Sequence, residues 1–355
     1  MQMNKISTVS IAATVAGAFI GAGFVSGQEL WQFFGAFGKT GVFMMLLSLS
    51  ILGSLCVIFT RYCKSTKLFY LDSAIFGDSP KWMNGVFCAL EMTIYFFLCV
   101  IMTSGFTALI DSFASKTVAN ALGLSFVVLV GVALFFGLQG LVRLFSLFIP
   151  LLVVATVVIS AVTLIRNGIV IPSEIENVKE NVLLSNPLLS CFLSLSYNFF
   201  GSVGILAPLS EKANSKKQLT AGAFLGALFL VIIAISILLA IFSTGTENEA
   251  LPMLEISKQI SPVLAVIYAF LLSSAMFSCS FSSGVCIVLF AEKRFFRSRR
   301  KKIIFISLYM LVVYLVSTVG FTGLISTVYP IFGYVGFILI FKVIYNAIHR
   351  RKHNV

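Results

Sequence analysis

The chain is a succession of long apolar runs separated by short segments that carry most of the charges. A helix of about 20 apolar residues crosses the hydrocarbon core of a bilayer. Only 11% of the residues are charged and 59% are hydrophobic, whereas a soluble domain has about 25% charged residues. We therefore predict an all-α integral membrane protein with about ten transmembrane helices. The predicted helices cover residues 7–36, 40–62, 84–113, 121–138, 142–166, 187–209, 218–243, 261–290, 302–320 and 323–347.

The basic residues indicate how these helices are oriented, because cytoplasmic loops carry an excess of Lys and Arg. With a cytoplasmic N-terminus, about 20 of the 25 Lys and Arg residues fall on the cytoplasmic side. We predict a plasma-membrane protein with both termini in the cytoplasm. The basic run 292–302 is expected to anchor this topology and could bind anionic lipid. Topology accounts for the net charge of +12, so no nucleic-acid partner is expected.

The acidic loop 167–186 divides this single transmembrane domain, residues 1–355, into two halves of five predicted helices, 7–166 and 187–347. An odd number of helices per half forces the halves into opposite orientations, which is an inverted repeat. The first helix of each half is rich in Gly and polar residues, over 17–29 and 194–208. Corresponding interruptions in two halves indicate the binding site of a secondary transporter, so we expect helices 1 and 6 to be broken. The alternative is that Gly17 and Gly21 form a helix-packing face.

Residues 20–34, Ile-Gly-Ala-Gly-Phe-Val-Ser-Gly-Gln-Glu-Leu-Trp-Gln-Phe-Phe, resemble the opening helix of the YkvI-type bacterial membrane proteins. The five-plus-five arrangement resembles the LeuT-fold superfamily of secondary transporters. This resemblance implies a sodium ion held by two carbonyls of helix 1 and by one carbonyl and two hydroxyls of helix 8. The matching residues are Gly17, Ile20, Cys279, Ser282 and Ser283. The fifth helix lacks the Lys that proton-coupled relatives use there, which favours sodium. The alternative is that the helix-8 serines join helices together.

An unwound first helix exposes backbone N–H groups that could face the carboxylate of an amino acid. We expect the polar residues of the sixth helix to flank such a substrate. The predicted substrate-binding residues are Ala22, Gly23, Ser26, Ser194, Ser196, Asn198 and Gly201.

Two acidic residues, Glu29 and Glu91, fall inside predicted spans. A charge at such a place costs about 2.5–3.5 kcal/mol on insertion scales, so each is a functional candidate. Glu29 is expected to line the external vestibule, where it could attract cations or exchange a proton. Glu91 is either a proton-coupling acid or the partner of a basic loop residue such as Arg143.

Together these features predict a secondary active transporter of a small organic solute, an amino acid or a related compound, driven by sodium or protons. The alternative is a sensor or receptor subunit that binds a small molecule without carrying it. The sequence contains no HExxH, no GxSxG and no acidic metal cluster, so we expect no enzymatic activity. No cofactor is expected other than the coupling ion.

Overall fold

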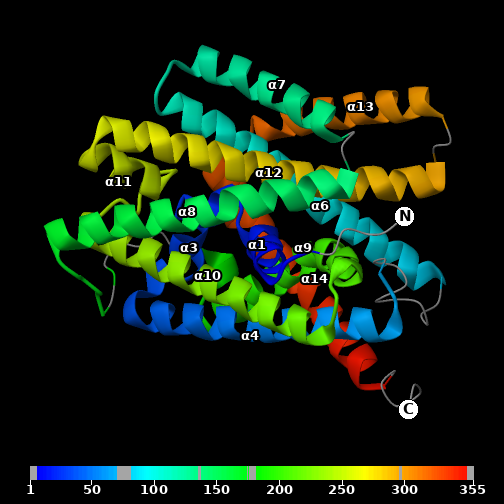
Figure 1. The fold of residues 1–355 in the computed structure, drawn as a ribbon. Coiled ribbons are helices and arrows are strands. Elements are labelled where there is room, and N and C mark those ends of the chain that lie inside the picture. Colours follow the sequence, from blue (N-terminus) through cyan, green and yellow to red (C-terminus); the bar gives the residue numbers. More distant parts are fainter. Residues whose placement is uncertain are drawn as a thin grey trace.

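The structure is a bundle of helices with α1 at its centre (Figure 1). It is a computed structural model that describes residues 6–69, 81–134, 137–173, 175, 181–295 and 298–349. The first half contains α1 (Thr8–Phe19), α2 (Ala22–Val25), α3 (Gln28–Phe33), η1 (Gly35–Phe37), α4 (Gly38–Thr66), α6 (Lys81–Asp111), α7 (Lys116–Ala133) and α8 (Gly137–Asn167). The second half contains η3 (Val182–Leu184), α9 (Pro187–Lys212), α10 (Lys216–Thr244), α11 (Pro252–Ile260), α12 (Pro262–Phe295), α13 (Arg299–Ser317) and α14 (Phe321–His349).

Within the described residues, eight helices are long and apolar enough to cross a membrane. They correspond to the predicted spans other than the first and the ninth. The first is interrupted, so that α1 has only 12 residues, and the ninth, α13, begins with four basic residues, Arg299 to Lys302. Large apolar side chains such as Leu129, Phe270 and Phe341 are exposed on the outside of the bundle, where a membrane protein meets lipid.

Helix contacts are paired in the way that an inverted repeat requires. Helix α1 packs on α10 and α8, while the first helix of the second half, α9, packs on α4 and α14. Likewise α7 contacts α12 and α13 contacts α6, and the equivalent helices α6 and α12 pack on each other. The predicted five-plus-five architecture is therefore present, whereas the exact repeat boundaries, 7–166 and 187–347, stay predictions.

The first predicted helix is broken twice, as the sequence indicated. Helix α1 ends where Ile20 adopts an extended conformation, with φ −76° and ψ 97°. At the second break Gly27 has φ +88°, a left-handed conformation that Gly adopts without steric cost. The Ser26 hydroxyl spans this break, donating to the Gly23 carbonyl at 3.2 Å and accepting from the Gln28 N–H at 3.3 Å.

The predicted break in the sixth helix is wrong, because α9 is continuous. Its small and polar residues serve local bonding and close packing instead. The Ser202 and Ser210 hydroxyls donate to carbonyls three residues earlier in the helix. A Cβ on Gly204 would stand 2.1 Å from the Tyr95 hydroxyl oxygen, so glycine here lets α6 approach α9. A helix break and a close helix contact select the same residue types, and the sequence pattern does not distinguish them.

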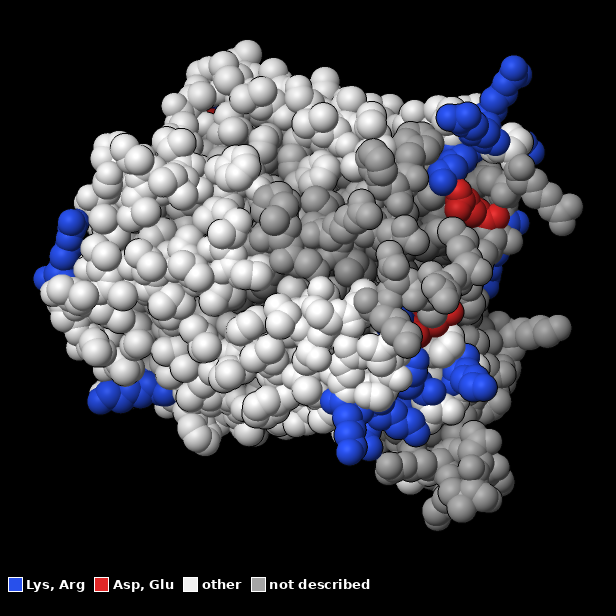
Figure 2. All heavy atoms as spheres, in the orientation of Figure 1, with Lys and Arg blue, Asp and Glu red and all other residues white. Residues whose placement is uncertain are grey.

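Charged side chains gather toward the two ends of the bundle. Figure 2 shows a large group of Lys and Arg at the end where α12 finishes and α13 begins, and smaller groups at the opposite end. Between them, the described part of the surface in this view is almost entirely uncharged. This distribution matches a bilayer-spanning bundle, and the assignment of the more basic end to the cytoplasm stays a prediction.

Candidate functional site

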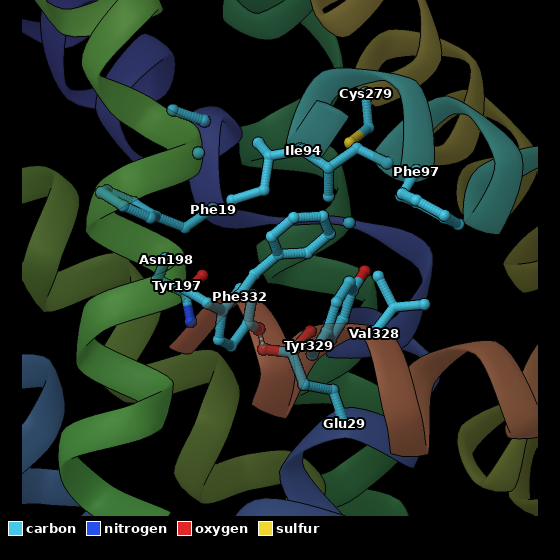
Figure 3. Close-up of a pocket in the computed structure, with 14 residues that line it drawn as sticks. Phe19, Glu29, Ile94, Phe97, Tyr197, Asn198, Cys279, Val328, Tyr329 and Phe332 are labelled. Atoms are coloured by element: carbon cyan, nitrogen blue, oxygen red, sulfur yellow. Dashed lines mark hydrogen bonds between the residues drawn. The ribbon is translucent and has the colours of Figure 1, made fainter. Parts of the chain in front are cut away.

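A narrow pocket lies beside the first break in helix 1 (Figure 3). Its cavity volume is about 30 Å³, which has room for roughly two or three water molecules. The lining residues are Ala18, Phe19, Gly21, Glu29, Ile94, Phe97, Leu98, Tyr197, Asn198, Gly201, Cys279, Val328, Tyr329 and Phe332.

The acidic group of this pocket is Glu29, which is only 3% exposed. Its Oε1 accepts a hydrogen bond from the Tyr197 hydroxyl, and the Asn198 side chain also lies against the carboxyl. Its Oε2 is 3.3 Å from the position that a Cβ on Gly23 would take. We expected Glu29 in an external vestibule; instead α3 contacts α9 and α14, so the side chain lies in the buried pocket.

Aromatic rings form much of the pocket wall. Tyr197 stacks on Tyr329 with ring centroids 4.6 Å apart and planes at 14°, and Phe97 meets Phe332 at 5.9 Å. The 14 lining residues include one acid and no Lys, Arg or His. Such a lining suits a solute with an apolar body and a cationic or hydrogen-donating group, since aromatic faces and a carboxyl group both attract cations.

Asn198 and Gly201 are the predicted substrate-binding residues that line the pocket. The Asn198 amide donates to the Ser194 carbonyl at 3.0 Å, so Ser194 supports the pocket residue through its backbone. Gly23 lies behind the Glu29 carboxyl. These positions therefore act at or next to the pocket.

Of the three other predicted substrate-binding residues, Ser26 and Ser196 are not among the described residues that line the pocket. The Ser26 hydroxyl is used in the second helix break. The Ser196 carbonyl lies 2.5 Å from the Cβ position of Gly336, so this part of α9 packs on α14. The side chain of Ala22 lies outside the described residues.

The predicted sodium ligands come from two segments that meet at the pocket. Cys279 lines it, and its Sγ is 3.8 Å from the Cβ position of Gly21, next to the predicted ligand Ile20. The Ser282 hydroxyl donates to the Cys279 carbonyl at 2.9 Å, and Ser283 is buried beside it. Carbonyls at the end of a helix, such as that of Gly17 in the last turn of α1, lack helical donors. The sodium site itself stays a prediction.

Glu91 lies in a different buried cluster. It is 1% exposed, and its Oε1 accepts a hydrogen bond of 2.7 Å from the Tyr95 hydroxyl one turn further along α6. The Arg143 side chain lies outside the described residues, so the predicted Glu91–Arg143 pair is not described. Among the described side chains, the ion pairs join Lys258 to Glu255 and Lys302 to Glu292, and neither involves a buried acid.

The pocket residues that come from α6 and α14 were not predicted from the sequence. They are Ile94, Phe97, Leu98, Val328, Tyr329 and Phe332. Apolar and aromatic residues are ordinary in transmembrane helices, so they give no signal of their own. The available hint was Pro330 inside α14, because a proline within a helix removes a backbone hydrogen bond and often accompanies function in membrane helices.

Comparison with known proteins gives the fold. No family model matches the chain. It is 25% identical over 365 residues to the membrane protein YkvI of Bacillus subtilis (strain 168), and the alignment covers 99% of both chains. The crystal structure of MhsT in complex with L-phenylalanine superposes with a TM-score of 0.69 at 15% identity, covering 96% of this chain and 89% of MhsT. The inward facing conformation of Mhp1 gives 0.65 at 14% identity, covering 99% of this chain and 78% of Mhp1.

The chain has the LeuT fold. The resemblance to YkvI-type and LeuT-fold proteins that residues 20–34 and the paired halves indicated is therefore confirmed. MhsT and Mhp1 are LeuT-fold transporters rather than enzymes. In this LeuT-fold protein the pocket lies at the first break of helix 1.

Proposed function

We propose that this LeuT-fold protein is a secondary active transporter that carries a small organic solute by alternating access. The observation that carries the proposal is the small pocket at the break between α1 and α2, which is walled by helices of both halves. Its lining comes from two groups of helices, α1, α3 and α9 in the first and α6, α12 and α14 in the second. Relative movement of these two groups would open the pocket to either side of the membrane.

The solute is an amino acid or a related amine. Glu29 offers an acceptor for an amino group, and the aromatic wall offers faces for a cation and for an apolar body. The L-phenylalanine bound in MhsT has both an amino group and an apolar body. The α2 segment has only four residues and the pocket lining holds no basic side chain, so the amino group is the better-recognised end.

Transport is coupled to sodium or to protons. The carbonyls of Gly17, Ile20 and Cys279 with the hydroxyls of Ser282 and Ser283 form an oxygen-rich set, which suits a hard monovalent cation. Glu29 and Glu91 are the proton-coupling candidates, because each is a buried acid for which the described residues show no cationic partner. We propose that the basic segment that includes Arg294 and Arg299 binds anionic headgroups of the inner leaflet.

The test is thermal stability of the purified protein in detergent with three probes that share one phenyl ring. The probes are 2-phenylethylamine, L-phenylalanine and 3-phenylpropionate, each in sodium and in potassium buffer. A ligand at about 100 times its Kd stabilises the folded state by about 2.7 kcal/mol. We expect stabilisation by the two amines and not by the acid, followed by gradient-driven uptake of the stabilising probe into proteoliposomes.

Gly201→Leu is the matched loss-of-function variant. A Cβ on Gly201 would meet Leu98 at 3.5 Å, an ordinary contact, so the larger side chain should fill the pocket without displacing the backbone. Gly323→Leu is the control, because a Cβ there meets nothing within 4 Å. Binding and uptake should be lost in the first variant and kept in the second. Binding without uptake under either gradient would contradict transport and favour a sensor.

A further inference from the structure

A second buried polar cluster lies just beyond the pocket, on the same three helices. Glu91 precedes the pocket residue Ile94 by three positions in α6, and Gly204 follows Gly201 by three in α9. Cys286 follows Cys279 by seven positions in α12. These offsets amount to one or two helical turns, about 5–10 Å. From the pocket, the three offsets lead toward the same end of the bundle, because α6 runs opposite to α9 and α12 in the predicted topology.

The Tyr95 hydroxyl joins α6 to α9 in this cluster. It donates to Glu91 Oε1 at 2.7 Å and accepts from the Gly204 N–H at 3.1 Å. Tyr95 and Glu91 are each 1% exposed, so no bulk water competes for these bonds. Gly204 is a sensitive point of α9, because Pro208 has no N–H to donate to the Gly204 carbonyl one turn earlier.

Few other ionisable groups face Glu91. Among the described side chains, the neighbours that interact with it are Tyr95 on α6 and the Cys286 thiol on α12, and this thiol also forms a hydrogen bond with Tyr95. Helix α9 contributes the Gly204 backbone N–H through Tyr95. The described ion pairs lie elsewhere, so a charge on Glu91 is stabilised chiefly by the Tyr95 hydroxyl.

The hydrogen bonds of this cluster depend on whether the Glu91 carboxyl group is protonated. A carboxylate only accepts hydrogen bonds, so the single Tyr95 proton must point to it, which leaves the Tyr95 lone pairs for the Gly204 N–H. A protonated Glu91 gains an O–H donor, and the Tyr95 hydroxyl oxygen lies within hydrogen-bond distance of the carboxyl group. That donor competes with the Gly204 N–H for the same oxygen.

We propose that Glu91 binds a proton and that Tyr95 transmits its arrival to α9, so that protonation loosens the α6–α9 contact beside the pocket. Tyr95 is a positioning residue in this scheme and does not touch the solute. The inference rests on the proposed transport function, because a looser contact is useful where α9 must move against α6. It assigns proton control to a site separate from the pocket and from Glu29.

The test is hydrogen–deuterium exchange of α9 peptides covering 199–207, in mildly acidic and mildly alkaline buffer, after correction for the intrinsic pH dependence of exchange. In the unmodified protein we expect exchange about fivefold faster in acid, the factor that one net hydrogen bond contributes. Glu91→Gln, whose amide can donate as the protonated acid does, should exchange fast in both buffers. Tyr95→Phe should do the same, because the link to Gly204 is removed.

A control separates this relay from other effects of pH. Glu255→Gln changes an acid that pairs with Lys258 outside the cluster and should keep the acid-dependent exchange. The proposal is overturned if the unmodified protein shows no pH effect at 199–207, or if Glu91→Gln retains it. Because exchange is measured without any solute, this result is independent of the uptake experiments that test transport.

Discussion

Gly204→Ala should destabilise the protein, whereas the same change three residues earlier should not. A Cβ at Gly204 would stand 2.1 Å from the Tyr95 hydroxyl oxygen and 3.0 Å from the ring carbon Cζ. An ordinary contact needs about 3.4 Å, so the hydroxyl must retreat by about 1.3 Å. Its 2.7 Å bond to Glu91 cannot survive such a movement.

The expected cost has three parts. Forcing extra volume into a packed interior costs about 1–3 kcal/mol, and leaving the buried Glu91 carboxyl without its donor costs another 1–3 kcal/mol or so. Alanine returns about 1 kcal/mol through its higher helix propensity. We expect a net loss of roughly 3 kcal/mol for Gly204→Ala. Gly201→Ala should gain up to about 1 kcal/mol, since its Cβ would meet Leu98 at 3.5 Å.

The assay is the melting temperature of both variants in one detergent, at a pH where the unmodified protein is stable. A difference of roughly 4 kcal/mol corresponds to a gap on the order of 10 °C between the two variants. Adding Tyr95→Phe to Gly204→Ala removes the clashing oxygen, so the double variant should regain part of the loss. If Gly204→Ala and Gly201→Ala melt at the same temperature, the close contact between Gly204 and Tyr95 does not contribute the stability predicted here.

Two other substitutions address the sodium site and the broken helix. Ser282→Ala combined with Ser283→Ala should abolish the stabilisation of the protein by sodium relative to potassium. Ser274→Ala should leave it unchanged, because the Ser274 hydroxyl bonds its own helix at 2.9 Å on an exposed face. Equal sodium responses in the double variant and in Ser274→Ala would refute the site. Gly27→Ala should cost more than 2 kcal/mol or so, because a left-handed alanine is strained and its Cβ would lie 2.6 Å from an Ile241 methyl. Gly245→Ala shares the positive φ, but its Cβ would make only an ordinary contact of 3.8 Å with Glu247 Oε2. Chemical unfolding should therefore show a loss of only about 1 kcal/mol, and comparable losses at both glycines would contradict the close approach at Gly27.

The membrane class and the repeat could be predicted from the sequence because both depend on patterns along the chain. Run length alone identifies a crossing helix, and an odd number of runs per half determines an inverted repeat. The break in helix 1 was also predictable, since Gly17, Gly21, Gly23 and Gly27 weaken one short segment. The continuity of the sixth helix was not predictable, because Gly204 is needed for close packing against the Tyr95 side chain, which lies 109 residues away in the sequence.

The pocket and its partners were decided by tertiary structure. Glu29 could be recognised from sequence as a costly residue, but the sequence did not show that its carboxyl would meet the Tyr197 hydroxyl, 168 residues away. Tyr329 and Phe97 entered the site through the rotation of their helices, which apolar composition does not determine when every face of a helix is apolar. Local sequence therefore determined which segments cross the membrane and where helix 1 breaks, whereas helix rotation and close packing decided which side chains share the pocket.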